Sequence, residues 1–124
     1  VTLMTLSGEQ VRRLLEQQFD NPRVGSTTML QVSNGFTYRY RLKAPAGEHV
    51  DRTSIQIDGR TIAPTDRVRV AASDFLFGGG DGFTVLTSAT EVVGVGSDID
   101  ALSAYVAKHS PLRPGPQDRY QRVD

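Results

Sequence analysis

The chain has 124 residues, a length that suits one domain with its own hydrophobic core. Its 14 basic residues are matched by 14 acidic ones, so the net charge does not favour binding to nucleic-acid backbones. The absence of cysteine excludes disulfides and thiolate chemistry. No apolar run approaches the roughly 18 residues of a membrane span, and no signal peptide is recognisable. Because the chain starts with valine, we expect an excised part of a longer protein.

The first elements are a strand and a helix. Residues 1–6 are prone to form a strand, and the Ser7 to Gln10 segment has the pattern of a capping box. Apolar residues follow at helical spacing, which predicts a helix over residues 8–19. The Asp20-Asn21-Pro22 segment is expected to end this helix.

Alternating and turn-bounded segments in the middle of the chain predict strands. Asn34-Gly35 is expected to turn between the first two, and Asp58-Gly59 is typical of a type I′ hairpin turn. The predicted strands cover residues 29–33, residues 36–43, the two arms of a hairpin at 54–62, and residues 67–72.

The sequence of the last third of the chain predicts two short strands and a helix. The strands cover residues 84–86 and 91–95, and the helix covers about 98–108. Four apolar side chains of this helix are expected to point inward: Ile99, Leu102, Tyr105 and Val106. Prolines follow, and residues 113–124 form a polar and irregular tail after a domain over residues 1–112.

These elements together predict an α+β fold. The strands are mainly antiparallel, with helices near 8–19 and 98–108 at either end. A doubly wound parallel sheet is excluded because the strands lack the alternating helices that parallel crossovers need.

A glycine-rich segment, Phe75-Leu76-Phe77-Gly78-Gly79-Gly80-Asp81-Gly82-Phe83, is the most informative part of the chain. Its glycines leave backbone that another molecule can approach closely. Phe75 precedes Asp81 by six residues, which sets a flat apolar ring near a carboxylate that only accepts hydrogen bonds. A nucleoside, with a flat base and vicinal hydroxyls, suits that pair.

Two purely structural explanations of the glycine-rich segment compete with nucleoside binding. A glycine cluster between two strands is often only a tight turn, and an aspartate there often caps its own backbone in an Asx turn. The segment is not a P-loop, because no Lys-Ser/Thr pair follows, and no helix pattern follows it as a dinucleotide-binding fingerprint requires. If the preceding strand continues, Phe75 and Phe77 lie on opposite faces.

The chain shows no catalytic set of its own. Its two histidines, His49 and His109, are isolated, and there is no cluster of metal ligands and no nucleophile elbow. His109 is expected near the C-terminal end of a helix. The stripe of Arg39, Arg41 and Lys43 is better explained as a solvated strand face than as an anion site.

Several segments resemble the C-terminal domain of the 5′-nucleotidase family, which includes bacterial 5′-nucleotidase/UDP-sugar hydrolases and animal ecto-5′-nucleotidase. The resemblance covers nearly the whole chain, and the Gly-Gly-Asp-Gly-Phe segment is its most specific part. The matching segments are Thr5-Leu6-Ser7-Gly8, Leu30-Gln31-Val32-Ser33, Ile57-Asp58-Gly59, Asp74 to Phe83, Asp98-Ile99-Asp100-Ala101-Leu102 and Ser110-Pro111-Leu112.

The resemblance implies a four-layer α/β/β/α fold and a division of labour. An N-terminal metallophosphoesterase domain, absent from this chain, would carry two divalent metal ions and perform the hydrolysis. The C-terminal domain would bind base and ribose, with no catalytic residue and no metal of its own. By this resemblance, Phe75 stacks on the base and Asp81 binds the ribose hydroxyls. Gly79, Gly80, Gly82 and Phe77 complete the substrate-binding set.

The resemblance also implies partners and a location. The expected partners are a nucleoside or nucleotide, the N-terminal catalytic domain and a homodimer mate, without nucleic acid or membrane insertion. The parent enzyme is expected to be extracellular, periplasmic or at the cell surface. The alternative hypothesis is a structural or dimerisation module of a metallophosphoesterase whose substrate is a non-nucleotide, a cyclic nucleotide or a sugar nucleotide.

Overall fold

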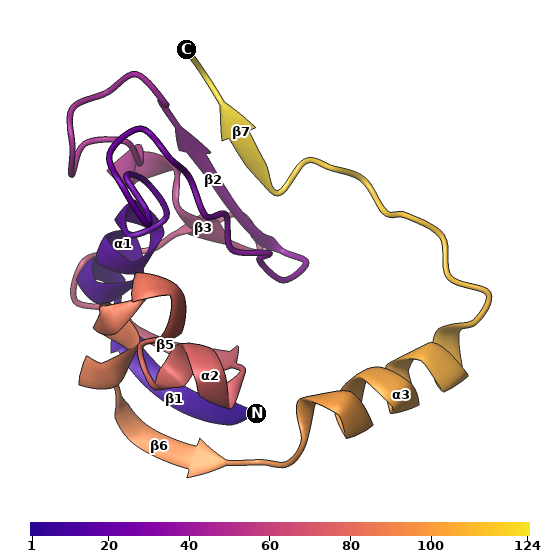
Figure 1. The fold of residues 1–124 in the computed structure, drawn as a ribbon. Coiled ribbons are helices and arrows are strands. Elements are labelled where there is room, and N and C mark those ends of the chain that lie inside the picture. The colour runs from indigo at the N-terminus through magenta and orange to yellow at the C-terminus, as the bar shows by residue number, and fades with distance from the viewer.

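Two separate β-sheets organise the chain, which the computed structural model describes over residues 1–124 (Figure 1). The first sheet has the order β5-β1-β6 and is antiparallel throughout. Its central strand pairs Thr2 with Ala72 and Ser7 with Arg67 on one side, and with β6 on the other. The strands are β1 (Thr2–Ser7), β5 (Arg67–Ala72) and β6 (Thr90–Gly94).

The second sheet has the order β4-β3-β2-β7. Its pairs β2–β3 and β3–β4 are antiparallel, whereas β7 runs parallel to β2. The hairpin between β3 and β4 turns at Asp58 and Gly59, both with positive φ, as the sequence predicts. The strands are β2 (Phe36–Tyr40), β3 (Gln56–Ile57), β4 (Arg60–Thr61) and β7 (Tyr120–Arg122).

Three α-helices and three 3₁₀ turns complete the fold, and the predicted α+β class is confirmed. The predicted helices near 8–19 and 98–108 are both present. The α-helices are α1 (Gly8–Glu16), α2 (Asp74–Phe77) and α3 (Asp98–His109). The 3₁₀ turns are η1 (Arg52–Ser54), η2 (Gly80–Gly82) and η3 (Thr84–Ser88).

The capping box at the start of α1 forms as predicted. The Gln10 amide donates to the Ser7 hydroxyl at 3.1 Å, and the Ser7 amide donates to the Gln10 side-chain oxygen at 2.8 Å. The helix packs its apolar face against β1 and η3. The core lies where these elements meet the aromatic side chains of the second sheet. Its best buried members are Met4, Leu6, Leu15, Tyr38, Phe83 and Leu86.

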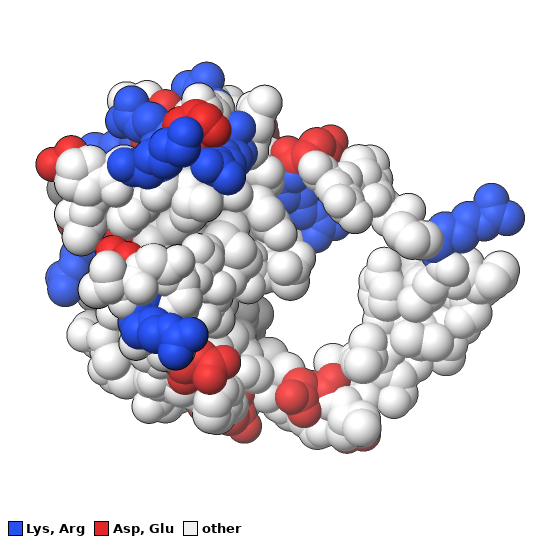
Figure 2. Space-filling model, turned by 45° about the horizontal axis from the view of Figure 1, so that its top comes forward, with Lys and Arg blue, Asp and Glu red and all other residues white.

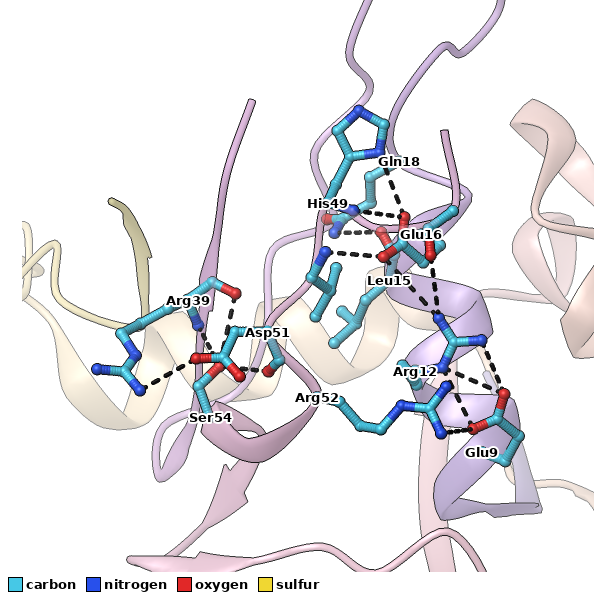
Figure 3. Close-up of polar contacts among 12 residues, drawn as sticks. Glu9, Arg12, Leu15, Glu16, Gln18, Arg39, His49, Asp51, Arg52 and Ser54 are labelled. Carbon is cyan, nitrogen blue, oxygen red and sulfur yellow. Dashed lines mark hydrogen bonds and ion pairs between the residues drawn. The ribbon is translucent and has the colours of Figure 1, made fainter. Parts of the chain in front are cut away.

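A polar network ties α1 to the segment that precedes η1 (Figure 3). The Glu16 carboxylate accepts from the Val50 amide at 2.7 Å and the His49 amide at 3.3 Å, and it also contacts His49 Nδ1. The buried His49 ring stacks on Phe19, with 4.4 Å between ring centroids. Each buried side-chain polar atom of this network has a hydrogen-bond partner, so the fold is not destabilised by an unsatisfied polar group there.

Helix α3 stands apart from the rest of the molecule. It follows β6 and leads through an extended segment to β7, so that the chain closes a ring (Figure 1). The opening remains when side chains are drawn (Figure 2). None of its residues is buried, and the inward orientation that we predicted for four of them is wrong within this chain: Ile99, Leu102, Tyr105 and Val106 are all exposed.

Three other local predictions differ from the structure. Residues 29–33 form no strand, because no neighbouring strand pairs with them; the Leu30 amide bonds the Gln18 side chain instead. Thr84–Ser88 is a 3₁₀ turn rather than a strand, which buries Val85 and Leu86. The tail is not irregular throughout, because β7 pairs with the edge of β2 and the Asp124 carboxylate accepts from the Leu42 and Lys43 amides. No helix is long and apolar enough to cross a membrane.

Candidate functional site

Phe75 is presented to solvent by a single helical turn. Strand β5 ends at Ala72, and the Ser73 hydroxyl then caps α2 by accepting from the Leu76 amide at 3.3 Å. The strand therefore does not continue to Phe75, so the condition under which we expected Phe75 and Phe77 on opposite strand faces is not met. The Phe75 side chain is 62% exposed. A large aromatic ring in that position leaves apolar area available to a ligand.

The Phe75 ring lies directly over the backbone of Gly80. A Cβ atom added at Gly80 would come within 2.6 Å of ring atoms Cε1 and Cζ and of the Phe75 carbonyl oxygen. Such a distance is shorter than any real contact of that kind, so only glycine permits this ring position. The glycine-rich backbone thus supports one edge of the ring while the rest remains exposed.

Asp81 adopts an unusual backbone conformation and keeps its carboxylate free. Its φ is 53° and its ψ is 26°, in the left-handed region that residues with a Cβ seldom adopt. The side chain is exposed, and no hydrogen bond or ion pair of the structure involves its carboxylate oxygens. The Asx turn that we weighed as an alternative is therefore not formed. Both oxygens remain available as acceptors.

Buried residues on either side hold this segment, which we call the 75–83 loop (residues 75–83). Phe83 is 1% exposed, and Val85 and Leu86 follow it into the core. On the other side, Leu76 and Phe77 are partly buried and pack against the same core. The exposed ring and the free carboxylate therefore sit on a segment anchored at both ends.

The remaining predicted site residues take different positions in the loop. Gly79 has a φ of +87°, which ends α2 and starts η2. Gly82 is exposed and lies against the side chain of Asn21. Phe77 is half-buried against the core rather than exposed beside Phe75. The structure thus brings Phe75, Gly80 and Asp81 together on the surface and directs Phe77 away from it.

Two amide side chains that the sequence did not single out touch this region. Asn21 Nδ2 donates to the Asp81 carbonyl oxygen at 2.8 Å. Gln17 Nε2 donates to the Thr84 hydroxyl at 2.7 Å, and the Gln17 side-chain oxygen accepts from the Val85 amide at 3.1 Å. We expected Asn21 only to end a helix. No local pattern could identify its second role, since its partner is 60 residues away in the chain.

One hollow beside the loop lies between α2 and the start of α3. It measures about 520 Å³ and adjoins Phe75, with Val1, Ser73, Asp74, Ser97 and Asp98 as its other lining residues. A second hollow of about 410 Å³ lies between β2, η1 and β7, lined by polar side chains and Tyr38. Phe75 does not line that second hollow and Asp81 lines neither, so the candidate site is the exposed surface of the 75–83 loop itself, beside the first hollow.

The acidic groups near the ring show one clear perturbation. The Thr2 hydroxyl donates to Asp74 at 2.7 Å and, with the nearby chain amino group, lowers the pKa of Asp74. No group of three or more histidine, cysteine, aspartate or glutamate side chains is placed to hold a metal ion. The two metal ions that the resemblance implies are expected on an N-terminal domain and not on these residues. His109 lies at the C-terminal end of α3, stacked on Tyr105.

Comparison with known proteins identifies relatives of this chain. The family model described as "5'-nucleotidase, C-terminal domain" matches residues 1–88. The "Trifunctional nucleotide phosphoesterase protein YfkN" of Bacillus subtilis is 34% identical over 88 residues, which cover 68% of this chain and 6% of that protein. The "Cell wall protein Lmo0130" of Listeria monocytogenes is 28% identical over 105 residues, covering 84% of this chain and 13% of that protein. The chain thus spans only a small part of these relatives.

Solved structures share the fold over almost the whole chain. The "5'-nucleotidase precursor" of Thermus thermophilus matches with a TM-score of 0.86 and 28% identity, covering 99% of this chain and 25% of that one. The Thermus thermophilus "Sulfate thiohydrolase SoxB" matches with a TM-score of 0.70 and 21% identity, covering 98% and 22%. At that identity the likeness shows the fold alone. The chain belongs to the 5′-nucleotidase C-terminal domain family.

Proposed function

We propose that this chain is the nucleoside-recognition domain of a metal-dependent 5′-nucleotidase-like phosphohydrolase. Phe75 stacks on the base, and Asp81 accepts hydrogen bonds from the ribose hydroxyls. The observation that carries the proposal is an exposed ring and a partner-free carboxylate on one anchored loop. Gly80 lets the Phe75 ring rest against the backbone, Gly79 and Gly82 supply the positive φ angles of the loop, and Phe77 supports the loop from its half-buried position.

The chemistry of the two groups sets the expected affinity. Stacking of a base on an aromatic side chain contributes about 1–3 kcal/mol, and a hydrogen bond to a charged group about 1.5–3 kcal/mol. Because association also costs translational and rotational freedom, these contributions leave a dissociation constant on the order of 1 mM or weaker. Binding by this chain alone is therefore weak, and it contributes mainly by positioning a nucleotide for another domain.

Hydrolysis belongs to the rest of the parent enzyme in this proposal. Two divalent metal ions on an N-terminal catalytic domain would activate water and polarise the phosphate. Contacts made here, remote from the phosphate, would align it over those ions and raise the rate through orientation. The isolated chain is expected to release no phosphate from AMP or UMP. Phosphate release by the purified chain that survives a chelator would contradict this proposal.

The relatives support a location outside the cytoplasm for the parent enzyme. One relative is named as a cell wall protein, and another as a 5′-nucleotidase precursor. We propose that the parent is secreted or attached to the cell surface. Assay of the intact parent in culture medium and cell-wall fractions would test this.

The binding test is an NMR titration of the chain with adenosine, uridine and 2′-deoxyadenosine at millimolar concentrations. We expect shifts at Phe75 and Asp81 and tighter binding of adenosine than of 2′-deoxyadenosine, which lacks one hydroxyl. Phe75→Ala should weaken adenosine and 2′-deoxyadenosine about tenfold, whereas Asp81→Asn, which loses the charge and one acceptor oxygen, should reduce the preference for ribose. Tyr105→Ala and Asp100→Asn change an exposed aromatic and an exposed carboxylate of α3 and serve as matched controls.

A second function is favoured by a separate observation. Helix α3 exposes an apolar face, as expected of an interaction surface, and the same fold occurs in an enzyme whose name specifies a sulfur compound. The domain would then be a structural or dimerisation module of a metallophosphoesterase with a non-nucleotide, cyclic-nucleotide or sugar-nucleotide substrate. No shift at Phe75 or Asp81 with any nucleoside, together with a dimer by sedimentation, would favour this function.

A further inference from the structure

The backbone of Asp81 is held by a side chain from the other end of the fold. Asn21 lies just beyond α1 and donates from Nδ2 to two carbonyl oxygens, those of Asp81 and Gln17, both at 2.8 Å. The Asn21 main chain is itself fixed, because its amide donates to the Ser26 carbonyl and its carbonyl accepts from the Thr28 hydroxyl. Asn21 is therefore a rigid bridge between the end of α1 and the 75–83 loop.

Asp81 benefits from such support. Its left-handed backbone conformation is one that aspartate adopts more readily than most residues with a Cβ, as Asp58 also does, but it still has a cost that contacts to this backbone offset. Its own carboxylate makes no hydrogen bond that could stabilise the conformation. The bond from Asn21 is the one side-chain hydrogen bond that Asp81 accepts. The Asn21 amide also packs against Gly82, where an added Cβ would lie 3.4 Å from Nδ2.

The neighbouring Gln17 extends the same arrangement along the chain. Its side chain bonds Thr84 and Val85, the two residues that follow the buried Phe83. Two amide side chains from one helix end thus bind the chain on both sides of Phe83. The backbone from which the Asp81 carboxylate projects is consequently held by residues that follow α1 as well as by the glycines.

We propose that Asn21 is a positioning residue for ribose recognition, which it serves by fixing the backbone of Asp81. This inference rests on the proposed binding of nucleosides by Phe75 and Asp81. Only an amide side chain of this length can donate to both carbonyl oxygens, because one nitrogen with two N–H groups reaches them. An aspartate in place of Asn21 would keep the shape of the side chain. Its carboxylate oxygens would only accept hydrogen bonds, however, and would face the two carbonyl oxygens, which also only accept.

The test compares Asn21→Asp with wild type in the binding of adenosine and 2′-deoxyadenosine, followed by NMR. We expect Asn21→Asp to lower adenosine affinity about tenfold and to bring the ratio between the two ligands close to one. Shifts of the Phe75 ring should persist in both complexes, because stacking does not depend on Asn21. A merely structural role would instead weaken both ligands equally or lower only the thermal midpoint.

The matched control is Asn34→Asp, which makes the same change at the only other asparagine, in the turn before β2. If Asn21→Asp fails to fold, Asn21→Ala removes both donors without adding charge and must reduce the same ratio. A wild-type preference for ribose that either folded Asn21 variant retains would overturn this inference and leave the proposed function intact. Absence of binding at Phe75 and Asp81 in the wild type would overturn both.

Discussion

At the scale of single residues, the site depends on one missing side chain. Gly80 lets the Phe75 ring rest on the backbone, whereas an added Cβ would lie 2.6 Å from two ring atoms and from the Phe75 carbonyl. We therefore expect Gly80→Ala to displace the ring and weaken adenosine binding about tenfold, as removal of stacking would. Gly115→Ala is the control, because no atom lies within 4 Å of the position of its added Cβ. Unchanged ring shifts in Gly80→Ala would contradict this account of Phe75.

Tyr38 provides a pH-dependent test of the core. Burial raises the pKa of Tyr38 to about 12, and Gln18 Nε2 donates to its hydroxyl at 3.0 Å. Because the folded state favours the neutral phenol, Tyr38 contributes stability that is present below about pH 10 and lost as the pH rises towards 12. Phenolate absorbance should therefore show a late step that Tyr38→Phe lacks. Retention of that step in Tyr38→Phe, or its loss in Tyr105→Phe, would contradict the assignment.

At the scale of elements, the two long helices should contribute very differently to stability. Leu15 of α1 is 2% exposed, whereas Leu102 of α3 is 61% exposed. Leu15→Ala should lower the free energy of unfolding by about 2–5 kcal/mol, whereas Leu102→Ala should change it by less than about 0.5 kcal/mol. Urea denaturation of both variants provides the measurement. Equal losses would mean that α3 packs against the body of this chain.

The same scale shows which elements local sequence can predict. The capping box of α1 and the turn at Asp58-Gly59 form as expected, because their determinants lie within four residues of one another. The strand predicted at residues 84–86 does not form. Its β-branched and apolar residues favour a strand, but burial of Val85 and Leu86 imposes a 3₁₀ turn over Thr84–Ser88. The strand β7 was missed because its partner β2 lies some eighty residues earlier in the chain.

The candidate site also shows how far local sequence alone can predict the structure. Phe75 and Asp81 could be selected from the sequence because they stand together in one short, glycine-rich segment. Asn21 and Gln17 could not, because each contacts that region from more than fifty residues away. The exposure of Phe75 also depends on the helical turn α2, which the sequence analysis did not predict. Local chemistry thus identified the candidate binding groups, and tertiary contacts supplied their support.

At the scale of the whole molecule, the chain separates into a packed body and an outlying arm. The body contains both sheets, α1 and the 75–83 loop, whereas α3 and the segment after it enclose an opening (Figures 1 and 2). The Thermus thermophilus 5′-nucleotidase precursor matches 99% of this chain, so the arm belongs to the shared fold. Because the loop is anchored in the body, we expect nucleoside binding to survive destabilising changes confined to α3.

The central claim concerns contact between a nucleoside and two named side chains. Transferred and intermolecular NOEs between adenosine and the isotope-labelled chain test it most directly. We predict NOEs from the base protons H2 and H8 to the Phe75 ring, and from the ribose protons H2′ and H3′ to the Asp81 β-protons. NOEs from adenosine to a different surface, or none at millimolar adenosine in a folded sample, would contradict it.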